Sequence, residues 1–223
     1  MKIFTDIEEL IGKKIYHDPR LEKLQKRAKS KKITFISIEF TDSDASACEG
    51  LVIKKSNIIN YIISDLEKVE RALERNPDNE ILHRVKDILE KEETISSHFT
   101  LQDAKKIKEY AFLTAKPIII FDTENIEELL RKVLEATGYI SFFTAGPNEA
   151  KAWLLKKGES IVGAASKIHT DLARGFIRAE VYNVEHLDEF ANPQDARAKG
   201  IMRVVDRDYA VNDGDVLNIK FKV

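Results

Sequence analysis

Two histidines with acidic neighbours come nearest to a catalytic arrangement in this chain of 223 residues. His17 directly precedes Asp18, and His169 stands two residues before Asp171, so each imidazole has a carboxylate that could orient it as a general base. A zinc site or a catalytic triad needs a further ligand or nucleophile, and no third histidine or cysteine stands at a suitable spacing. The residue types therefore predict no catalytic residue, no metal and no other cofactor.

The composition is that of a globular protein. Hydrophobic residues make up 43% of the chain, charged residues make up 33%, and the formal net charge is −2. No apolar run approaches the roughly 18 residues that a membrane span needs. Acids interrupt the first ten residues, where a signal peptide would be apolar. The single Cys48 excludes an intrachain disulfide. We expect a cytoplasmic protein with no membrane partner, in which any contact with nucleic acid is local.

Positive charge is concentrated between Lys13 and Lys32, where nine basic residues accompany two acidic ones. A helix is predicted to begin near Asp18, and its period places several of these cations on one face. Such a face could contact RNA phosphates, which gives affinity but little sequence reading. A solvated, lysine-rich surface explains the pattern equally well. The candidate binding residues are Lys13, Lys14, Arg20, Lys23, Lys26, Arg27 and Lys29.

Residues 57–112 have the pattern of a helical hairpin. Apolar residues alternate in steps of three and four, which is the a/d pattern of a coiled coil. Pro77 disfavours helical geometry at Asn76, so a turn is predicted between two antiparallel helices. The alternative is two helices packed on a globular core. The two seams are formed by Ile59, Ile62, Leu66, Val69 and Leu73, and by Leu82, Val85 and Leu89.

Strands and helices mix on both sides of this hairpin. Residues 32–40 alternate between apolar and polar side chains, as a half-buried strand does, and residues 117–121 are continuously apolar, as in a strand covered on both faces. Residues 125–137 have helical periodicity and are followed by Gly138. We predict one α/β domain formed by residues 1–56 and 113–138.

Three segments of the carboxyl-terminal part, FFTAGPNEAKAW (142–153), KIHTDLARGFIRAEV (167–181) and NDGDVLNIKF (212–221), resemble the TGS domain of the YchF-type ATPases. This family is a branch of the Obg-related P-loop NTPases. The segments 7–24, 65–75 and 113–121 resemble its Ras-like domain and hairpin insert more weakly. The resemblance implies a remnant Ras-like α/β domain with a helical hairpin insert, followed by a ubiquitin-like β-grasp TGS domain at 139–223. The fold class is therefore α/β (α+β).

The nucleotide-binding motifs of that family are altered or missing. No G-x-x-x-x-G-K-[ST] run, which cradles phosphates, occurs in the 223 residues. The family's D-x-A-G switch falls on residues 42–45, where Asp42 is kept and the glycine is replaced by Ala45. Its base-reading N-x-x-E motif falls on residues 122–125, where Thr123 replaces the asparagine. We predict a chain that is not an enzyme, with Asp42 as a weak remnant of a nucleotide site.

The resemblance implies a function as a non-hydrolysing adaptor or regulator at the ribosome or on RNA, since TGS domains are associated with both. Lys199 and Arg203 are the candidate contacts in the TGS domain. No preference for DNA is indicated. Two alternatives stay open: weak residual binding of ATP or GTP, and regulation of a protein partner.

Overall fold

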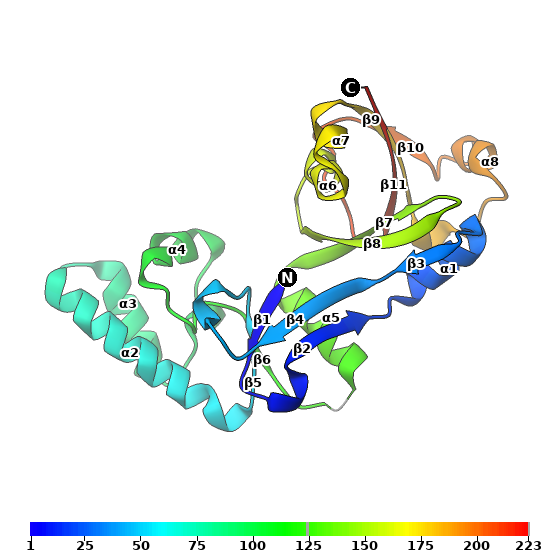
Figure 1. Ribbon diagram of the computed structural model, residues 1–223. Coiled ribbons are helices and arrows are strands. Elements are labelled where there is room, and N and C mark those ends of the chain that lie inside the picture. Colours follow the sequence, from blue (N-terminus) through cyan, green and yellow to red (C-terminus); the bar gives the residue numbers. More distant parts are fainter. Residues whose placement is uncertain (124, 223) are drawn as a thin grey trace. The chain divides into compact units, whose positions relative to one another are not determined.

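A computed structural model describes residues 1–123 and 125–222 and divides the chain into two compact units (Figure 1). Unit 1 comprises Met1–Lys14 and Ser37–Thr137, and unit 2 comprises Ile15–Ile36 and Gly138–Val223. Each unit has its own sheet together with helices, so the predicted α/β (α+β) fold class is confirmed. Residues 15–36 group with the carboxyl-terminal segment, whereas the predicted domain division places them in the amino-terminal domain.

The sheet of unit 1 has five strands in the order β2-β4-β1-β5-β6. The central β1 is parallel to β4 on one side and to β5 on the other, and β6 is parallel to β5. The strands are β1 (Lys2–Thr5), β2 (Gly12–Tyr16), β4 (Ile36–Thr41), β5 (Leu51–Ile53) and β6 (Ile118–Ile120). The strand predicted at 117–121 is confirmed by β6. The predicted helix at 125–137 is confirmed by α5 (Ile126–Ala136), which the side chain of Asn125 caps.

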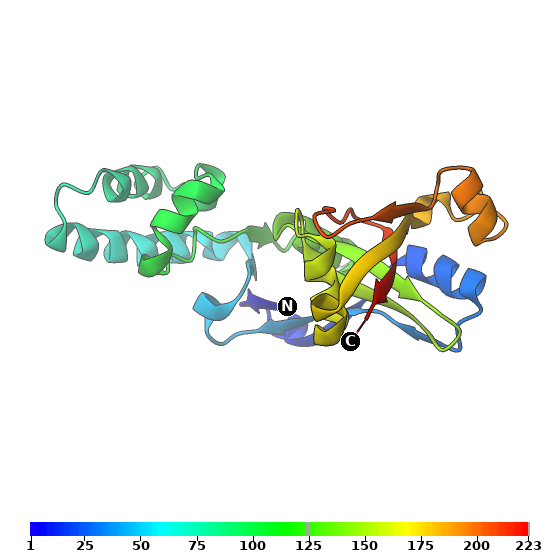
Figure 2. The same ribbon diagram turned by 90° about the horizontal axis from the view of Figure 1, so that it is seen from above.

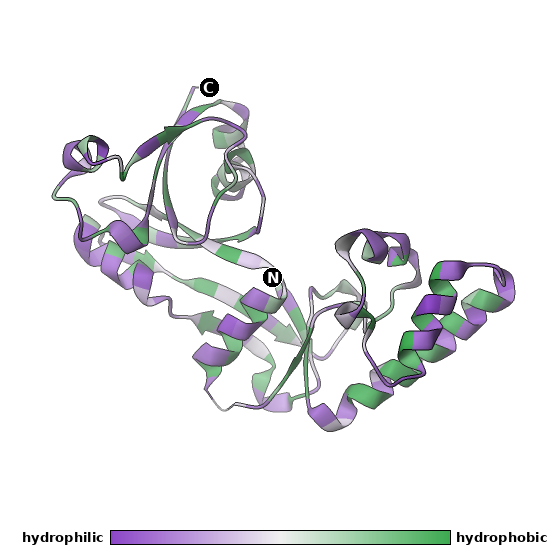
Figure 3. Cartoon of the chain, turned by 180° about the vertical axis from the view of Figure 1, so that it is seen from behind, coloured by the Kyte–Doolittle hydropathy of each residue, from purple (hydrophilic) through white to green (hydrophobic). Residues whose placement is uncertain are grey.

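The predicted antiparallel hairpin is confirmed by α2 (Ile58–Arg75) and α3 (Glu80–Leu89), which lie side by side (Figure 2). Figure 3 shows hydrophobic and hydrophilic residues side by side along both helices. A third segment joins their core, because Ile95, Ile107 and Phe112 are buried in the same cluster as the seam residues. This segment contains η4 (Ile95–Ser97), α4 (Leu101–Lys106) and η5 (Lys108–Tyr110). This third segment therefore covers the hairpin, and the periodicity of α2 and α3 does not predict it.

A buried carboxylate joins the hairpin to the strand that follows it. Asp65 of α2 is fully buried, and its oxygens accept hydrogen bonds from Leu113 N (3.1 Å) and from Thr114 N (2.7 Å) and Oγ1 (2.9 Å). The ammonium of Lys68 also donates to Asp65 at 2.9 Å. Since buried polar groups need such partners, this network fixes where the chain leaves the hairpin and enters β6.

The sheet of unit 2 has six strands in the order β10-β9-β11-β7-β8-β3. The strands are β3 (Lys32–Thr34), β7 (Tyr139–Ala145), β8 (Glu149–Lys156), β9 (Phe176–Asn183), β10 (Arg203–Val205) and β11 (Asp215–Phe221). The helices α6 (Ile161–Ile168) and α7 (Thr170–Arg174) pack on one face, where Phe142, Ala165 and Leu217 belong to one core. Two antiparallel strands, a helix, and a parallel pairing of β11 with β7 are the β-grasp arrangement.

Two strand predictions need correction. The single strand predicted at 32–40 is two strands, because β3 pairs with β8 and β4 pairs with β1, in different sheets. The turn residues Asn212-Asp213-Gly214-Asp215 also predict a hairpin that leads into residues 216–223. In the structure β11 follows this turn and pairs with β9 and β7 rather than with β10. In both places the sequence pattern is local, whereas the strand partner is determined by distant parts of the chain.

One helix comes to unit 2 from the beginning of the chain. α1 (Pro19–Ala28) starts after Asp18, whose side chain accepts a hydrogen bond from Arg20 N, as the predicted helix start requires. Its buried residues Leu21 and Leu24 lie on the side that packs against β7 and β8. A further excursion between β9 and β10 contains η6 (Val184–His186) and α8 (Pro193–Ala198).

Candidate functional site

Arg20, the first cation of α1, binds other residues of unit 2. The Arg20 guanidinium donates to both carboxylate oxygens of Asp18, with Nη2 to Oδ2 at 2.8 Å, and to Oδ2 of Asp213. Its Cζ lies 5.4 Å from the ring centroid of Phe143 on β7. Burial alone would lower the pKa of Arg20, but hydrogen bonds to these two carboxylates raise it above its ordinary value. Arg20 therefore attaches α1 to the rest of unit 2.

The next two cations on this face, Lys23 and Arg27, also have partners in unit 2. Lys23 pairs with Asp188, with Nζ to Oδ2 at 2.6 Å, although both side chains are exposed. The Arg27 guanidinium donates to the carbonyl oxygens of Phe190 and Ala191 and lies 5.7 Å from the ring centroid of Phe190. These contacts hold the excursion between β9 and β10 against α1.

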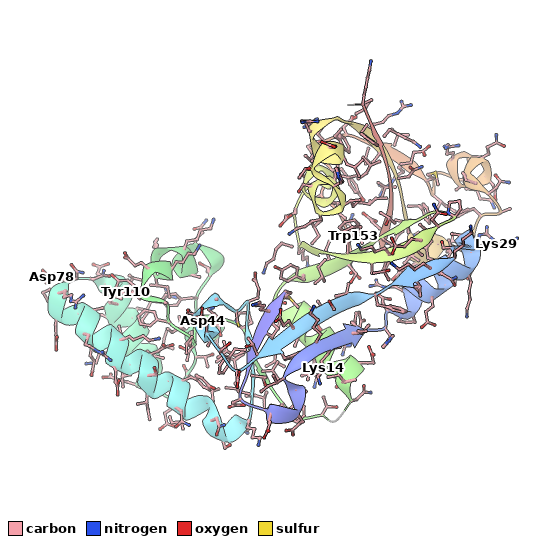
Figure 4. All side chains as sticks on the ribbon, viewed as in Figure 1. Lys14, Lys29, Asp44, Asp78, Tyr110 and Trp153 are labelled. Atoms are coloured by element: carbon pink, nitrogen blue, oxygen red, sulfur yellow. The ribbon has the colours of Figure 1, made fainter. Side chains whose placement is uncertain are left out.

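The remaining predicted cations of the amino-terminal patch lie in two places. Lys26 and Lys29 are exposed at the end of α1, where Lys29 is the cap residue with φ 51° (Figure 4). Lys13 and Lys14 lie on β2 in unit 1, and the Lys14 ammonium donates to Glu9 O at 3.1 Å. The predicted patch is thus divided between the two units. Of the candidates on α1 and at its cap, only the Lys26 and Lys29 side chains extend into solvent without a hydrogen-bond or ion-pair partner in the described part of the chain.

The structure brings the two carboxyl-terminal candidates together. Lys199 and Arg203 line one pocket of about 350 Å³ with Asn183, His186, Glu189, Gly200 and Ile201. The Lys199 ammonium donates to Glu189 O (2.8 Å) and to Asp195 Oδ2 (3.0 Å). Arg203 is exposed and has no carboxylate partner in the described part of the chain, with its Cζ 6.0 Å from the ring of Tyr209. Arg203 is therefore the cation of this pocket that is available to an anionic ligand.

The carboxyl edge of the unit 1 sheet is where the resemblance places a nucleotide. Asp6, directly after β1, accepts hydrogen bonds from Lys54 N (3.2 Å) and from Asn57 Nδ2 (2.7 Å), which join the ends of β1 and β5. Asp42 follows β4 and is exposed. At the predicted base-reading motif, Asp122 pairs with Lys132 at 2.9 Å, and Glu124 lies outside the described residues. The side chains at this edge thus serve mainly to connect structural elements.

A lysine holds the loop after β4. The Lys116 ammonium donates to the carbonyl oxygens of Ala45 (2.9 Å), Ser46 and Cys48. Burial lowers the pKa of Lys116. Burial also raises the pKa of the Cys48 thiol, whose side chain is 4% exposed, so this cysteine is not an activated nucleophile.

The described residues offer few other sites. Within the described ranges, no group of three or more histidine, cysteine or carboxylate side chains is placed to hold a metal. None of the described helices combines the length and the apolar character that crossing a bilayer requires. One groove that sequence reasoning missed lies on the hairpin of unit 1 and is lined by Lys68, Arg71, Arg75 and Tyr110. The sequence feature that could have indicated this groove is the spacing of its three cations by three and four residues along α2.

Comparison with known proteins matches the part of the chain that carries the Lys199 pocket. The model of the YchF-GTPase_C family, described as a protein of unknown function (DUF933), matches residues 139–222. Residues 139–222 are thus similar to the YchF-GTPase_C family. The predicted resemblance to the YchF-type proteins is thereby confirmed for this domain.

Curated relatives extend this finding. Obg-like ATPase 1 of Xenopus laevis is 42% identical over 100 residues, which are 43% of this chain and 25% of that protein. The Ribosome-binding ATPase YchF of Escherichia coli O157:H7 is 43% identical over 99 residues, which are 44% of this chain and 27% of that protein. The chain thus spans about a quarter of the length of the curated YchF relatives that it matches.

A solved structure supports the fold of both units. The Schizosaccharomyces pombe YchF GTPase aligns with a TM-score of 0.80 over 96% of this chain and 88% of that one, at 16% sequence identity. This likeness establishes the YchF fold.

The prediction that this chain belongs to a non-enzymatic class is wrong. The finding that overturns it is that the relatives are named ATPases and that the matching structure is that of a GTPase. Because the relatives are matched over a quarter of their length, the missing phosphate-loop motif does not decide what the protein does.

Proposed function

We propose that this protein binds the ribosome through unit 2 and acts there as a regulator or adaptor, in the cytoplasm. The observation that carries the proposal is the 43% identity over 99 residues with a protein named Ribosome-binding ATPase YchF. A β-grasp unit with a family match at 139–222 supports the assignment of the binding surface to this part of the chain.

Within unit 2, we assign the contact to the pocket of Lys199 and Arg203. This pocket lies inside the segment matched by the family model, whereas Lys26 and Lys29 lie outside it. Arg203 offers a planar guanidinium that can bind a phosphate of ribosomal RNA through two parallel hydrogen bonds. Lys26 and Lys29 provide a second exposed basic surface, and they serve as the comparison in the test.

The test is sedimentation of the purified chain with ribosomes through a sucrose cushion. The Lys199→Glu/Arg203→Glu variant should remain in the supernatant, and the Lys26→Glu/Lys29→Glu variant should sediment like the unaltered chain. The Lys157→Glu/Lys167→Glu variant is the matched control, because both lysines are exposed on unit 2 and lie outside the pocket. Failure of the unaltered chain to sediment at low salt would exclude the ribosome as the partner.

ATP or GTP binding is the second candidate function, and the ATPase names of the relatives favour it. Its place would be the carboxyl edge of the unit 1 sheet, near Asp42. Saturable binding of a fluorescent ATP or GTP analogue, weakened by Asp42→Ala, would support it. A protein partner in place of RNA is a further outcome of the sedimentation test, recognised by binding that withstands RNase.

A further inference from the structure

The pocket of Lys199 and Arg203 is bounded mostly by one segment of unit 2. Five of its seven described lining residues belong to residues 184–202, the excursion between β9 and β10 that contains α8 (Figure 1). Asn183 and Arg203 stand at the two ends of this excursion. The shape of the pocket therefore depends on the contacts that hold the excursion in place.

The second half of the excursion is attached to the sheet. Arg197 of α8 donates to Glu180 Oε1 of β9 through Nε at 3.2 Å and also through Nη2. The Glu180 side chain is 13% exposed, and Ala196 of the same helix is fully buried. These contacts fix α8, whose cap residue is Lys199.

The first half of the excursion, residues 184–191, is attached to α1, and we call it the arm. Phe190 of the arm is 7% exposed, and its ring meets Tyr182 edge-on, with centroids 5.3 Å apart. Arg27 Cζ lies 5.7 Å from the centroid of the Phe190 ring. Arg27 Nη2 also donates to Phe190 O and to Ala191 O, the latter at 2.8 Å. One guanidinium thus contacts the ring and binds two consecutive carbonyl groups.

These two carbonyl groups lie next to the atoms that orient Lys199. The preceding carbonyl oxygen, that of Glu189, accepts a hydrogen bond from Lys199 Nζ at 2.8 Å. Ala191 N donates to Asp195 Oδ2 at 2.8 Å, and the same oxygen accepts a hydrogen bond from Lys199 Nζ at 3.0 Å. The Arg27 guanidinium and the Lys199 ammonium therefore bind adjacent peptide groups of residues 189–191. A displacement of these residues would move the Lys199 ammonium.

α1 also fixes the start of the arm. Arg20, two turns earlier on the same helix face, pairs with Asp213. The carbonyl oxygen of Asp213 accepts a hydrogen bond at 2.8 Å from Nδ2 of Asn183, which lines the pocket. Between these points Lys23 pairs with Asp188 of the arm at 2.6 Å. One face of α1 thus holds the arm along its whole length.

We propose that Arg27 is a positioning residue of this pocket: it holds residues 189–191 in the arrangement that directs the Lys199 ammonium into the Arg203 pocket. The inference rests on the proposed function, since it names a residue that the ribosome contact requires and that does not itself touch the ribosome. Arg27 lies outside residues 139–222, which the family model matches. The binding surface of unit 2 is therefore completed by a helix from the beginning of the chain.

The test measures the dissociation constant of the labelled full chain for purified ribosomes at several salt concentrations. An arm that keeps the binding arrangement for only about a tenth of the time raises the apparent constant about tenfold, so Arg27→Ala should raise it by about three- to tenfold. The slope of log K against log salt should not change in this variant, because Arg27 neutralises no phosphate. Arg203→Glu removes a phosphate contact and should lower the slope by about 0.7 to 0.9.

Two further variants separate geometry from charge. Lys26→Ala removes the same charge at the adjacent exposed position, and it should bind ribosomes within about twofold of the unaltered chain because long-range charge is screened. Arg27→Lys keeps the charge but loses the planar fork that binds two carbonyl groups. It should therefore bind ribosomes more weakly than the unaltered chain and more tightly than Arg27→Ala.

Amide hydrogen exchange, followed by mass spectrometry without ribosomes, reports on the arm itself. Residues 184–191 should exchange faster in Arg27→Ala than in the unaltered chain, while β7, β8 and α6 should keep their rates, because the arm opens locally. Unchanged exchange in these other elements also shows that the variant is folded.

The inference fails if Arg27→Ala leaves the exchange of the arm unchanged, or if it binds ribosomes as well as Lys26→Ala does. A lower salt slope in Arg27→Ala would make Arg27 a direct phosphate contact and would also overturn it. Normal ribosome binding by Arg203→Glu would refute the proposed pocket, and the exchange measurement alone would then decide whether Arg27 holds the arm.

Discussion

Arg20 and Asp213 are 193 positions apart in sequence and form an ion pair within unit 2. Asp213 Oδ1 also accepts a hydrogen bond from Ser141 N at 2.8 Å, and its carbonyl oxygen accepts one from Asn183 Nδ2 at 2.8 Å. This aspartate therefore links α1, β7 and the end of β9. The first helix of the chain is thus a structural part of the carboxyl-terminal unit.

Removing this pair should destabilise unit 2. Arg20→Ala takes away hydrogen bonds to two carboxylates and should lower the free energy of unfolding by about 1–3 kcal/mol, toward the lower end because Asp213 is 49% exposed. Urea unfolding of Arg20→Ala, Asp213→Ala and the double variant measures the coupling between the two residues. Additive effects of the two substitutions would contradict a direct interaction.

Asp65 should be one of the most sensitive positions of unit 1. Asp65→Ala leaves the buried N–H and hydroxyl of Thr114 without an acceptor, so the free energy of unfolding should fall by about 3 kcal/mol. Thr114→Val removes only the hydroxyl and should cost about 1 kcal/mol. Chemical unfolding of both variants checks the order. Equal losses would mean that the carboxylate contributes no more than one hydrogen bond.

The hairpin core should respond to substitutions according to burial. Leu82 is fully buried, so Leu82→Ala should lower the free energy of unfolding by about 2–5 kcal/mol, whereas the partly buried Leu66 should lose less as alanine. Thermal melting compares the two variants. A larger loss for Leu66→Ala would place the centre of the hairpin core elsewhere.

Unit 2 should lose stability at alkaline pH. Burial raises the pKa of Tyr182 from its ordinary value of 10.0 to about 12, and the ring packs edge-on against Phe190. The unfolded chain therefore releases this proton at lower pH than the folded one, so the contribution is complete below about pH 10 and is lost as the pH approaches 12. Tyr182→Phe should reduce this loss when unfolding is followed against pH. An unchanged pH dependence would assign it to other tyrosines.

The sequence predicts those elements whose pattern is local. The hairpin, α1 with its Asp18 cap and α5 follow from periodicity and capping residues. The resemblance of short motifs between residues 142 and 221 to the YchF-type proteins adds the β-grasp order and the family. Strand partners could not be predicted in this way, because nothing in residues 32–40 indicates that β3 and β4 belong to different sheets.

The candidate site was predictable only in part. Lys199 and Arg203 stand close in sequence, and the structure places them in one pocket. The helical period of the α1 cations fits a solvent-exposed face as well as a bound one, yet Arg20 and Arg27 bind other residues of unit 2. Their partners Asp213 and Phe190 are distant in sequence, so periodicity cannot reveal them. Tyr110 and Lys68 come together for the same reason, through tertiary packing.

Ribosome binding through the Arg203 pocket is tested most directly by the dissociation constant of the labelled full chain for purified ribosomes. Arg203→Glu removes a charge-assisted contact that contributes about 1.5–3 kcal/mol, so the constant should rise by at least about tenfold, with an unchanged melting temperature. Lys167→Glu, an equal charge change on the same unit, should leave the constant unchanged. If Arg203→Glu and Lys167→Glu bind ribosomes equally well, this pocket is not the ribosome contact.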